Sequence, residues 1–97
     1  MTIAEFQKLI ERIYLERDRG RGTEKTFVWF IEEIGELAKA LGRPDKVPPG
    51  NLEQEFADVL AWLTTLASLA EVDLEAAAKE KYGSGCPKCR SIPCACG

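Results

Sequence analysis

The sequence predicts an all-α fold in which antiparallel helices form a bundle that dimerisation completes. Apolar residues recur every three or four positions in several segments, which is the period of an amphipathic helix. No segment of useful length alternates apolar and polar residues as a strand does, and no internal repeat is present. A chain of 97 residues accommodates three or four helices but buries only a modest core, so self-association would stabilise it.

The first helix is expected over residues 3–17. Its apolar residues fall on one face: Ile3, Phe6, Ile10, Ile13 and Tyr14. Thr2 and Glu5 have the spacing of a capping box at its start. The glycines of the segment RDRGRG, residues 17–22, are expected to end the helix and to form a solvated loop.

The second helix is expected over residues 24–41, with Thr23 as its N-cap and with Gly42 and Pro44 ending it. Seven apolar residues fall within about a third of its circumference. They are Phe27, Phe30, Ile31, Ile34, Leu37, Ala38 and Leu41. This stripe indicates an amphipathic helix.

A turn-rich linker, GRPDKVPPG at residues 42–50, separates the second helix from the third. Asn51 and Gln54 have the spacing of a capping box, and the third helix is expected to run from there to about Ala70. The linker is short, which favours antiparallel packing of the two helices that it joins.

Asp73 is expected to cap a shorter fourth helix that ends near Tyr82. All four cysteines of the chain follow this helix. The chain is therefore expected to consist of a helical domain, residues 1–83, and a cysteine-rich tail, residues 84–97.

Composition excludes several classes of function. The net charge of -3 and the pI of about 5.0 argue against direct binding to nucleic acid or to an anionic membrane, which needs a basic surface. No apolar run has the length of a membrane span or the form of a signal peptide, so we expect a soluble, cytoplasmic protein. The absence of histidine excludes Ser/His and Cys/His catalysis and histidine-rich zinc sites.

Two pairs of carboxylates are the strongest functional signal in the helical domain. Glu33 and Glu36 lie three residues apart on the second helix, and Glu55 and Asp58 lie three apart on the third. Residues with this spacing share one face of a helix. If the helices are antiparallel, the two pairs can meet and bind a hard cation such as Mg²⁺. The alternative is a solvated acidic face that Lys or Arg residues one turn away stabilise.

The neighbouring charges favour the cation. Among these acids and Glu32, only Glu36 has a cationic neighbour three or four positions away, which is Lys39. Asp58 is the only charged residue among the fifteen positions 56–70, an apolar stretch that we expect to be buried on more than one side. An unpaired carboxylate in such a place needs a metal, a hydrogen-bond donor or a proton.

The sequence EEIGE at residues 32–36, followed after eighteen residues by EFAD at 55–58, resembles the EExxE…ExxD signature of the MazG-like, all-α nucleotide pyrophosphohydrolases. The resemblance covers roughly residues 3–82. It implies hydrolysis of nucleoside triphosphates between the α and β phosphates, a Mg²⁺ cofactor that Mn²⁺ can replace, and assembly as a homodimer or homotetramer. A role in sanitation of the nucleotide pool follows from the same resemblance.

The resemblance also implies roles for individual residues. The positions that match the Mg²⁺ ligands of the family are Glu33, Glu36, Glu55 and Asp58. Glu32 and Glu33 are the candidate catalytic residues, with Glu32 orienting or deprotonating the attacking water.

Substrate contacts are matched less completely. Family members often carry a Lys and then an Asn/Arg pair after the last helix, and this chain offers Lys79 and Lys81 without the Asn. Four other cations are alternatives for contacting phosphate from a neighbouring subunit: Arg17, Arg19, Arg21 and Lys25. Trp29 is the preferred base-stacking residue because it projects on the Glu33 side of its helix; Trp62, Phe6 and Gln7 are alternatives, although aromatic residues at helical spacing usually belong to a core.

The tail contains Cys86, Cys89, Cys94 and Cys96, in the pattern CPKCRSIPCAC. The first half resembles a zinc knuckle, and four thiolates can close a tetrahedral Zn²⁺ site. Two disulfides, a disordered reduced tail, and an iron–sulfur or redox centre are the alternatives. The alternative to an enzyme is therefore a zinc-bearing helical module that serves dimerisation and protein interaction without catalysis.

Overall fold

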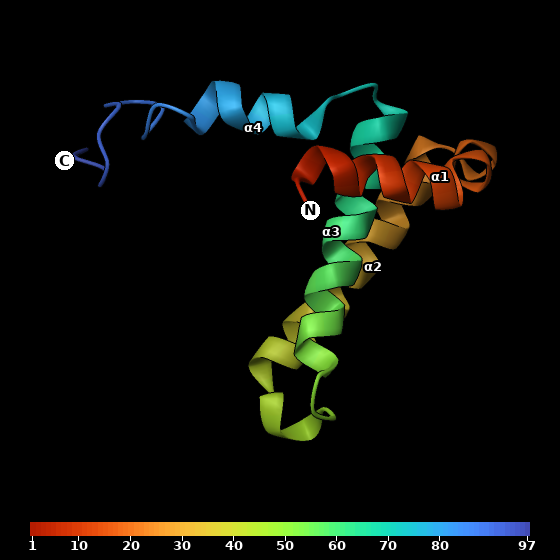
Figure 1. Ribbon diagram of the computed structural model, residues 1–97. Helices are drawn as coiled ribbons and strands as arrows, with labels where there is room; N and C mark the ends of the chain where they lie inside the picture. The colour runs from red at the N-terminus through yellow and green to blue at the C-terminus, as the bar shows by residue number, and fades with distance from the viewer.

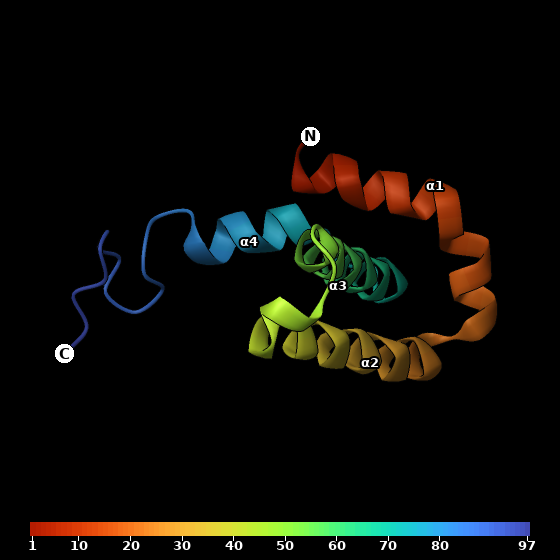
Figure 2. The ribbon, with the colours of Figure 1, turned by 90° about the horizontal axis from the view of Figure 1, so that it is seen from below.

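The computed structural model describes residues 1–97 and confirms the all-helical prediction. It contains four α-helices, one 3-10 turn and no strand: α1 (Ile3–Arg21), α2 (Thr23–Gly42), the turn Pro44–Lys46, α3 (Asn51–Leu69) and α4 (Leu74–Tyr82). α2 and α3 run antiparallel and side by side, as the short linker predicted (Figure 1). α3 lies between α1 and α2, whereas α4 and the tail extend away from these three helices (Figure 2).

α1 begins as predicted and ends later than predicted. Thr2 Oγ1 accepts a hydrogen bond from Glu5 N at 3.0 Å, and Thr2 N donates to Glu5 Oε1 at 2.8 Å, which confirms the capping box. The predicted loop at residues 17–22 is wrong, because the helix continues through Gly20 to Arg21. A helical glycine costs only about 1 kcal/mol relative to alanine, and tertiary contacts of the last turn, described below, offset that cost.

A single glycine separates α1 from α2. Gly22 has φ 90° and ψ 162°, a region of backbone space that is essentially restricted to glycine. Gly22 is also the N-cap of α2, so the prediction that Thr23 caps this helix is wrong. Thr26 closes the first turn instead: its backbone N–H and its hydroxyl both donate to the Gly22 carbonyl, at 3.1 and 2.7 Å.

A second glycine begins α3. The predicted capping box at Asn51 is wrong, because Gly50 occupies the cap position in the left-handed conformation (φ 84°) and no side chain caps the helix. The fourth helix, in contrast, is capped and ended as predicted. Asp73 accepts a hydrogen bond from Ala76 N at 3.0 Å, and α4 ends at Tyr82.

Gln7 fixes α1 against the turn between α3 and α4. Its side-chain nitrogen donates to Ser68 Oγ at 3.1 Å and to the Val72 carbonyl at 2.9 Å, and its oxygen accepts from Leu74 N at 3.1 Å. The amide is buried, and both of its polar atoms are hydrogen-bonded within this junction.

Much of the apolar surface is uncovered. The only buried apolar residues are Ile10, Ala40 and Ala67. The stripe predicted on the second helix is largely exposed, and so is the first half of the stretch 56–70, which we expected to be buried; only its second half is buried, around Thr64. The radius of gyration is 15.9 Å, whereas a compact domain of this length has about 12.5 Å. The single chain therefore leaves faces of α2 and α3 without a packing partner.

None of the four helices combines the length and the hydropathy that crossing a bilayer requires.

Candidate metal centre and adjoining pocket

Three of the predicted carboxylates converge between α2 and α3. One oxygen each of Glu33, Glu55 and Asp58 lies within 4.8 Å of the other two. Glu33 comes from the middle of α2, while the other two lie one turn apart near the start of α3. Antiparallel packing therefore brings together residues that are more than twenty positions apart in the sequence.

The other two predicted acids lie outside this triad. Glu36 is exposed, and its Oε1 is 3.4 Å from Nζ of Lys39, the one cationic neighbour that the sequence offered. Glu32 is also exposed on α2. The negative charges of both residues nevertheless help to raise the pKa of Glu33.

The triad is electrostatically unfavourable without a cation. Partial burial raises the pKa of Glu33, and the negative charges of Asp58 and Glu55 raise it further, with smaller effects from Glu36 and Glu32. Glu55 Oε2 is buried and has no hydrogen-bond partner. Asp58 is exposed, contrary to the expectation from the apolar stretch around it, because the helix faces beside it are uncovered. The three carboxylates of the triad offer oxygen ligands, which suit a hard divalent cation.

Two tryptophans and one arginine form a cluster next to the triad. The Trp29 and Trp62 rings meet edge to face, with centroids 5.8 Å apart and an interplanar angle of 79°. The guanidinium carbon of Arg21 lies 4.8 Å from the Trp29 centroid and 4.9 Å from the Trp62 centroid. These are cation–π distances, so Arg21 joins the end of α1 to α2 and α3.

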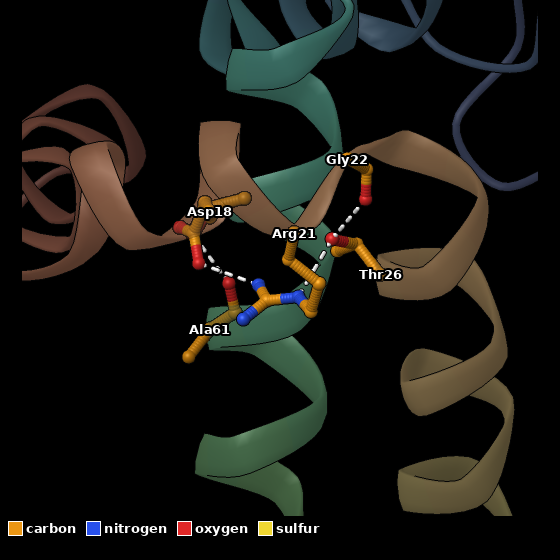
Figure 3. A network of polar contacts seen from close by, with 6 residues as sticks. Asp18, Arg21, Gly22, Thr26 and Ala61 are labelled. Atoms are coloured by element: carbon orange, nitrogen blue, oxygen red, sulfur yellow. Dashed lines mark hydrogen bonds and ion pairs between the residues drawn. The ribbon is translucent and has the colours of Figure 1, made fainter.

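Arg21 is also part of a buried polar network (Figure 3). Its Nη2 donates to Asp18 Oδ1 at 2.5 Å, and its Nε donates to Thr26 Oγ1 at 2.9 Å. The side chains of this ion pair are only 8% and 7% exposed. Arg21 is therefore committed to structural contacts. The sequence contains a signal for this pair, because Asp18 and Arg21 are three residues apart, but the predicted loop concealed it.

A pocket of about 240 Å³ lies between α1, α2 and α3. Its lining includes Tyr14, Arg17, Asp18 and Arg21 from α1, Trp29 from α2, and Asp58 and Trp62 from α3. Asp58 thus belongs both to the acidic triad and to the pocket wall. Trp29, the predicted base-stacking residue, lies in this wall, whereas Phe6 does not. The contributions of Tyr14 and Asp18 were not predicted, because they depend on how α1 packs.

The structure does not bring Lys79 and Lys81 to the triad of their own chain. Both lie on exposed positions of α4, and that helix extends away from the α2 and α3 pair (Figures 1 and 2). Nζ of Lys81 lies 5.7 Å from the ring centroid of Tyr82. A role at the phosphates of a neighbouring subunit stays a prediction.

The four cysteines of the tail are also brought together. One sulfur of each, from Cys86, Cys89, Cys94 and Cys96, lies within 4.8 Å of the other three, and all four are free thiols. The tail that carries this cluster lies beyond the end of α4, away from α2 and α3 (Figure 1).

A family model described as the MazG nucleotide pyrophosphohydrolase domain matches residues 21–90, more than two thirds of the chain. The matched part contains the whole acidic triad and both tryptophans, and it ends between the two halves of the cysteine motif. No curated protein is similar enough to this chain to count as a match.

Proposed function

This chain belongs to the MazG nucleotide pyrophosphohydrolase family, and on that premise we propose that it hydrolyses nucleoside and deoxynucleoside triphosphates between the α and β phosphates. The products are a nucleoside monophosphate and pyrophosphate, and the proposed role is sanitation of the nucleotide pool. The observation that carries the proposal is the convergence of Glu33, Glu55 and Asp58 beside a pocket lined by two tryptophans.

Mg²⁺, or Mn²⁺ in its place, is the proposed cofactor, bound by Glu33, Glu55 and Asp58. The buried, unpartnered Oε2 of Glu55 and the raised pKa of Glu33 both support binding of a cation at this point. When bound, such a cation neutralises phosphate charge and activates water. Glu36 would join the ligand set only by leaving Lys39, an exposed partner whose ion pair stabilises little.

The residues of the chain then have separate tasks in the reaction. Glu32, exposed one position before Glu33, orients the attacking water and accepts its proton. The water oxygen forms a bond to the α phosphorus, the bond from that phosphorus to the bridging oxygen breaks, and pyrophosphate leaves with this oxygen. Glu33 contributes by holding the cation.

The pocket is proposed to take the base and sugar of the substrate. Asp58 lines both the pocket and the triad, so a nucleoside in the pocket would direct its phosphates toward the acids. Trp29 and Trp62 provide aromatic surface in the pocket wall for contact with the base. Arg17 is the pocket cation available to phosphate, because it has no ion-pair partner, whereas Arg21 is held by Asp18. Lys79 and Lys81 would act from a second subunit.

The direct test is a hydrolysis assay. Purified protein is incubated with each of a panel of nucleoside and deoxynucleoside triphosphates and Mg²⁺, and monophosphate and pyrophosphate are quantified. We expect Asp58→Asn to lower kcat/KM by about 10- to 100-fold or more, because even changes in the outer shell of a metal site cost that much. Glu53→Gln is the matched control, since Glu53 is exposed on the same helix outside the triad.

The proposal fails if no nucleotide in the panel is cleaved, or if Asp58→Asn is as active as the parent. Release of phosphate instead of pyrophosphate would also contradict it, because the β–γ bond would then be the one that breaks. Loss of hydrolysis after removal of divalent cations, restored by Mg²⁺, is the expected result for the cofactor.

A further inference from the structure

The C-terminal segment folds its four thiols into a compact cluster that the proposed hydrolysis does not use. Cys86 Sγ lies 3.5 Å from Cys94 Sγ and 3.7 Å from Cys96 Sγ. A disulfide holds its two sulfurs about 2.05 Å apart, so these pairs are not bonded. Within eleven residues, the segment 86–96 thus presents four sulfurs to one point.

The spacing of the sulfurs is that of a tetrahedral metal site. Zn–S bonds are about 2.3 Å long, and the edges of a tetrahedron with that radius are about 3.8 Å. The two measured separations, 3.5 and 3.7 Å, are close to this value. The remaining pairs lie within 4.8 Å, so only small movements would close the tetrahedron.

Backbone groups also support the cluster. Ala95 N donates to Cys89 Sγ at 3.3 Å, and Cys96 N donates to Cys94 Sγ at 3.4 Å. These hydrogen bonds tie two of the four sulfurs to the backbone of the same segment. A tight turn encloses the first pair of cysteines, because Arg90 N donates to the Cys86 carbonyl at 2.6 Å.

The turn requires unusual backbone conformations. Arg90 has φ 61°, and Gly85, which precedes the first cysteine, has φ 108°. A Cβ atom on Gly85 would lie 3.0 Å from the Arg90 carbonyl oxygen and 3.0 Å from Ile92 Cγ1. Conformations of this kind persist where the surrounding structure holds them in place. A metal ion bound by all four sulfurs would hold the backbone of this short segment in that way.

We propose that Cys86, Cys89, Cys94 and Cys96 bind one Zn²⁺ tetrahedrally, and that this structural site fixes the fold of the C-terminal segment. Four thiolates around Zn²⁺ carry a net charge of -2, and Lys88 and Arg90, between and beside the ligands, provide two positive charges in the same segment. Because protein ligands fill all four positions, the site leaves none open for hydrolysis.

This site is separate from the proposed activity. Cys94 and Cys96 lie beyond the residues that the family model matches, and the cluster lies beyond α4, away from the triad (Figure 1). The proposed zinc site and the proposed hydrolysis can therefore be confirmed or contradicted independently of each other.

The test uses the full chain, purified anaerobically with a reductant that does not bind metal. Elemental analysis is expected to give about one zinc per chain, as for a closed structural site. Replacement of zinc by Co²⁺ is expected to give the intense visible and near-ultraviolet absorption of tetrahedral thiolate coordination. Cys94→Ser is expected to lose both signals. The control Ser91→Ala is expected to retain them, because it removes only a hydroxyl and keeps the Ser91 carbonyl that accepts from Cys86 N.

Three outcomes would overturn the proposal: four free thiols that take up neither Zn²⁺ nor Co²⁺, two disulfides in freshly prepared protein, or bound iron with the absorption of an iron–sulfur cluster. Circular dichroism checks that Cys94→Ser retains the helices, as expected from the position of the tail outside α1 to α3. If that variant keeps the tetrahedral Co²⁺ spectrum, Cys94 is not a ligand and the four-cysteine site is wrong.

Discussion

Arg21 is the residue at which three helices meet. Its guanidinium pairs with Asp18 on α1, donates to Thr26 on α2, and lies over the rings of Trp29 and Trp62. A planar guanidinium can make these contacts together, whereas the point charge of a lysine cannot. The buried ion pair therefore specifies the geometry of the pocket wall as well as the packing of α1.

Replacement of Arg21 should destabilise the protein strongly. Arg21→Met leaves Asp18 buried and unpaired, and breaking a buried pair in this way costs about 3–5 kcal/mol. Urea unfolding of the parent and the variant measures this loss. Arg17→Met is the matched control, because Arg17 is exposed on the same helix and has no ion-pair partner, with an expected change within about 0.5 kcal/mol. Equal effects of the two substitutions would contradict a structural role for Arg21.

Glu33 should make the metal-free protein sensitive to pH. Its pKa is raised in the folded state, so its protonated form favours folding, and that contribution is lost as pH rises through the folded pKa. Glu33→Gln replaces the carboxyl with a neutral amide, so the variant does not lose this stability as pH rises. In the presence of a chelator at neutral pH, we therefore expect the variant to have a higher Tm than the parent.

The difference in Tm between the metal-free parent and Glu33→Gln should disappear below about pH 4, where glutamates are largely protonated even in unfolded chains. Thermal unfolding at both pH values checks this. Mg²⁺ should raise the Tm of the parent more than that of Glu33→Gln, because the variant has lost a ligand. A metal-free parent that is more stable than the variant at neutral pH would show that Glu33 has a favourable partner instead.

At the scale of helices, the sequence predicts elements better than it predicts their ends. Apolar period and the short linker were sufficient for the antiparallel α2 and α3 pair, and hence for the meeting of Glu33 with Asp58. Two caps were assigned to polar side chains, at Thr23 and Asn51, where the preceding glycine took the cap position. A glycine with positive φ competes with a capping side chain, and local sequence does not decide which prevails.

The candidate site likewise has a part that the sequence predicts and a part that it does not. The triad depends on two helices that are adjacent in sequence, so spacing was enough to predict it. The pocket depends on α1 packing against both, and Asp18 and Tyr14 enter it only through that packing. Glu36 has the right spacing, but it turns to Lys39, a choice of side-chain orientation that helical periodicity does not determine.

Gly22 should be the least replaceable residue of the α1 to α2 junction. Its backbone conformation is essentially closed to other residues, so Gly22→Ala is expected to destabilise the protein by about 1–3 kcal/mol. Gly20→Ala, two residues earlier in helical conformation with open space around it, should instead stabilise by up to about 1 kcal/mol. Chemical denaturation of both variants measures the contrast. Destabilisation by Gly20→Ala would show that α1 does not continue through that position.

At the scale of the whole molecule, the chain exposes more surface than a monomer of its mass should. Its accessible surface is 7292 Å², against about 5,500 Å² for a compact monomer of this size. The excess, roughly 1,800 Å² per chain, is of the order that each subunit buries in an obligate interface. Exposed apolar residues on α2 and α3, among them Phe27, Ile31, Phe56 and Leu60, make these helices the expected interface.

The protein should therefore be a dimer or a larger assembly in solution, and Leu60→Lys should shift it toward monomer. Buried in a subunit interface, the introduced charge would lose its hydration without a partner. Sedimentation velocity over a range of concentrations measures the change. Val72→Lys is the control, because Val72 has the same 42% exposure as Leu60 but lies in the turn before α4. A monomeric parent, or equal effects of both variants, would contradict the assignment of the interface.

The tryptophan pair has a practical consequence. Trp29 and Trp62 are the only tryptophans of the chain, and both line the pocket that Asp58 shares with the acidic triad. All indole fluorescence therefore originates within one site, where the Arg21 guanidinium lies over both rings, so the protein carries an intrinsic optical reporter. Nucleotide binding and detachment of α1 should each be visible in its emission without any label.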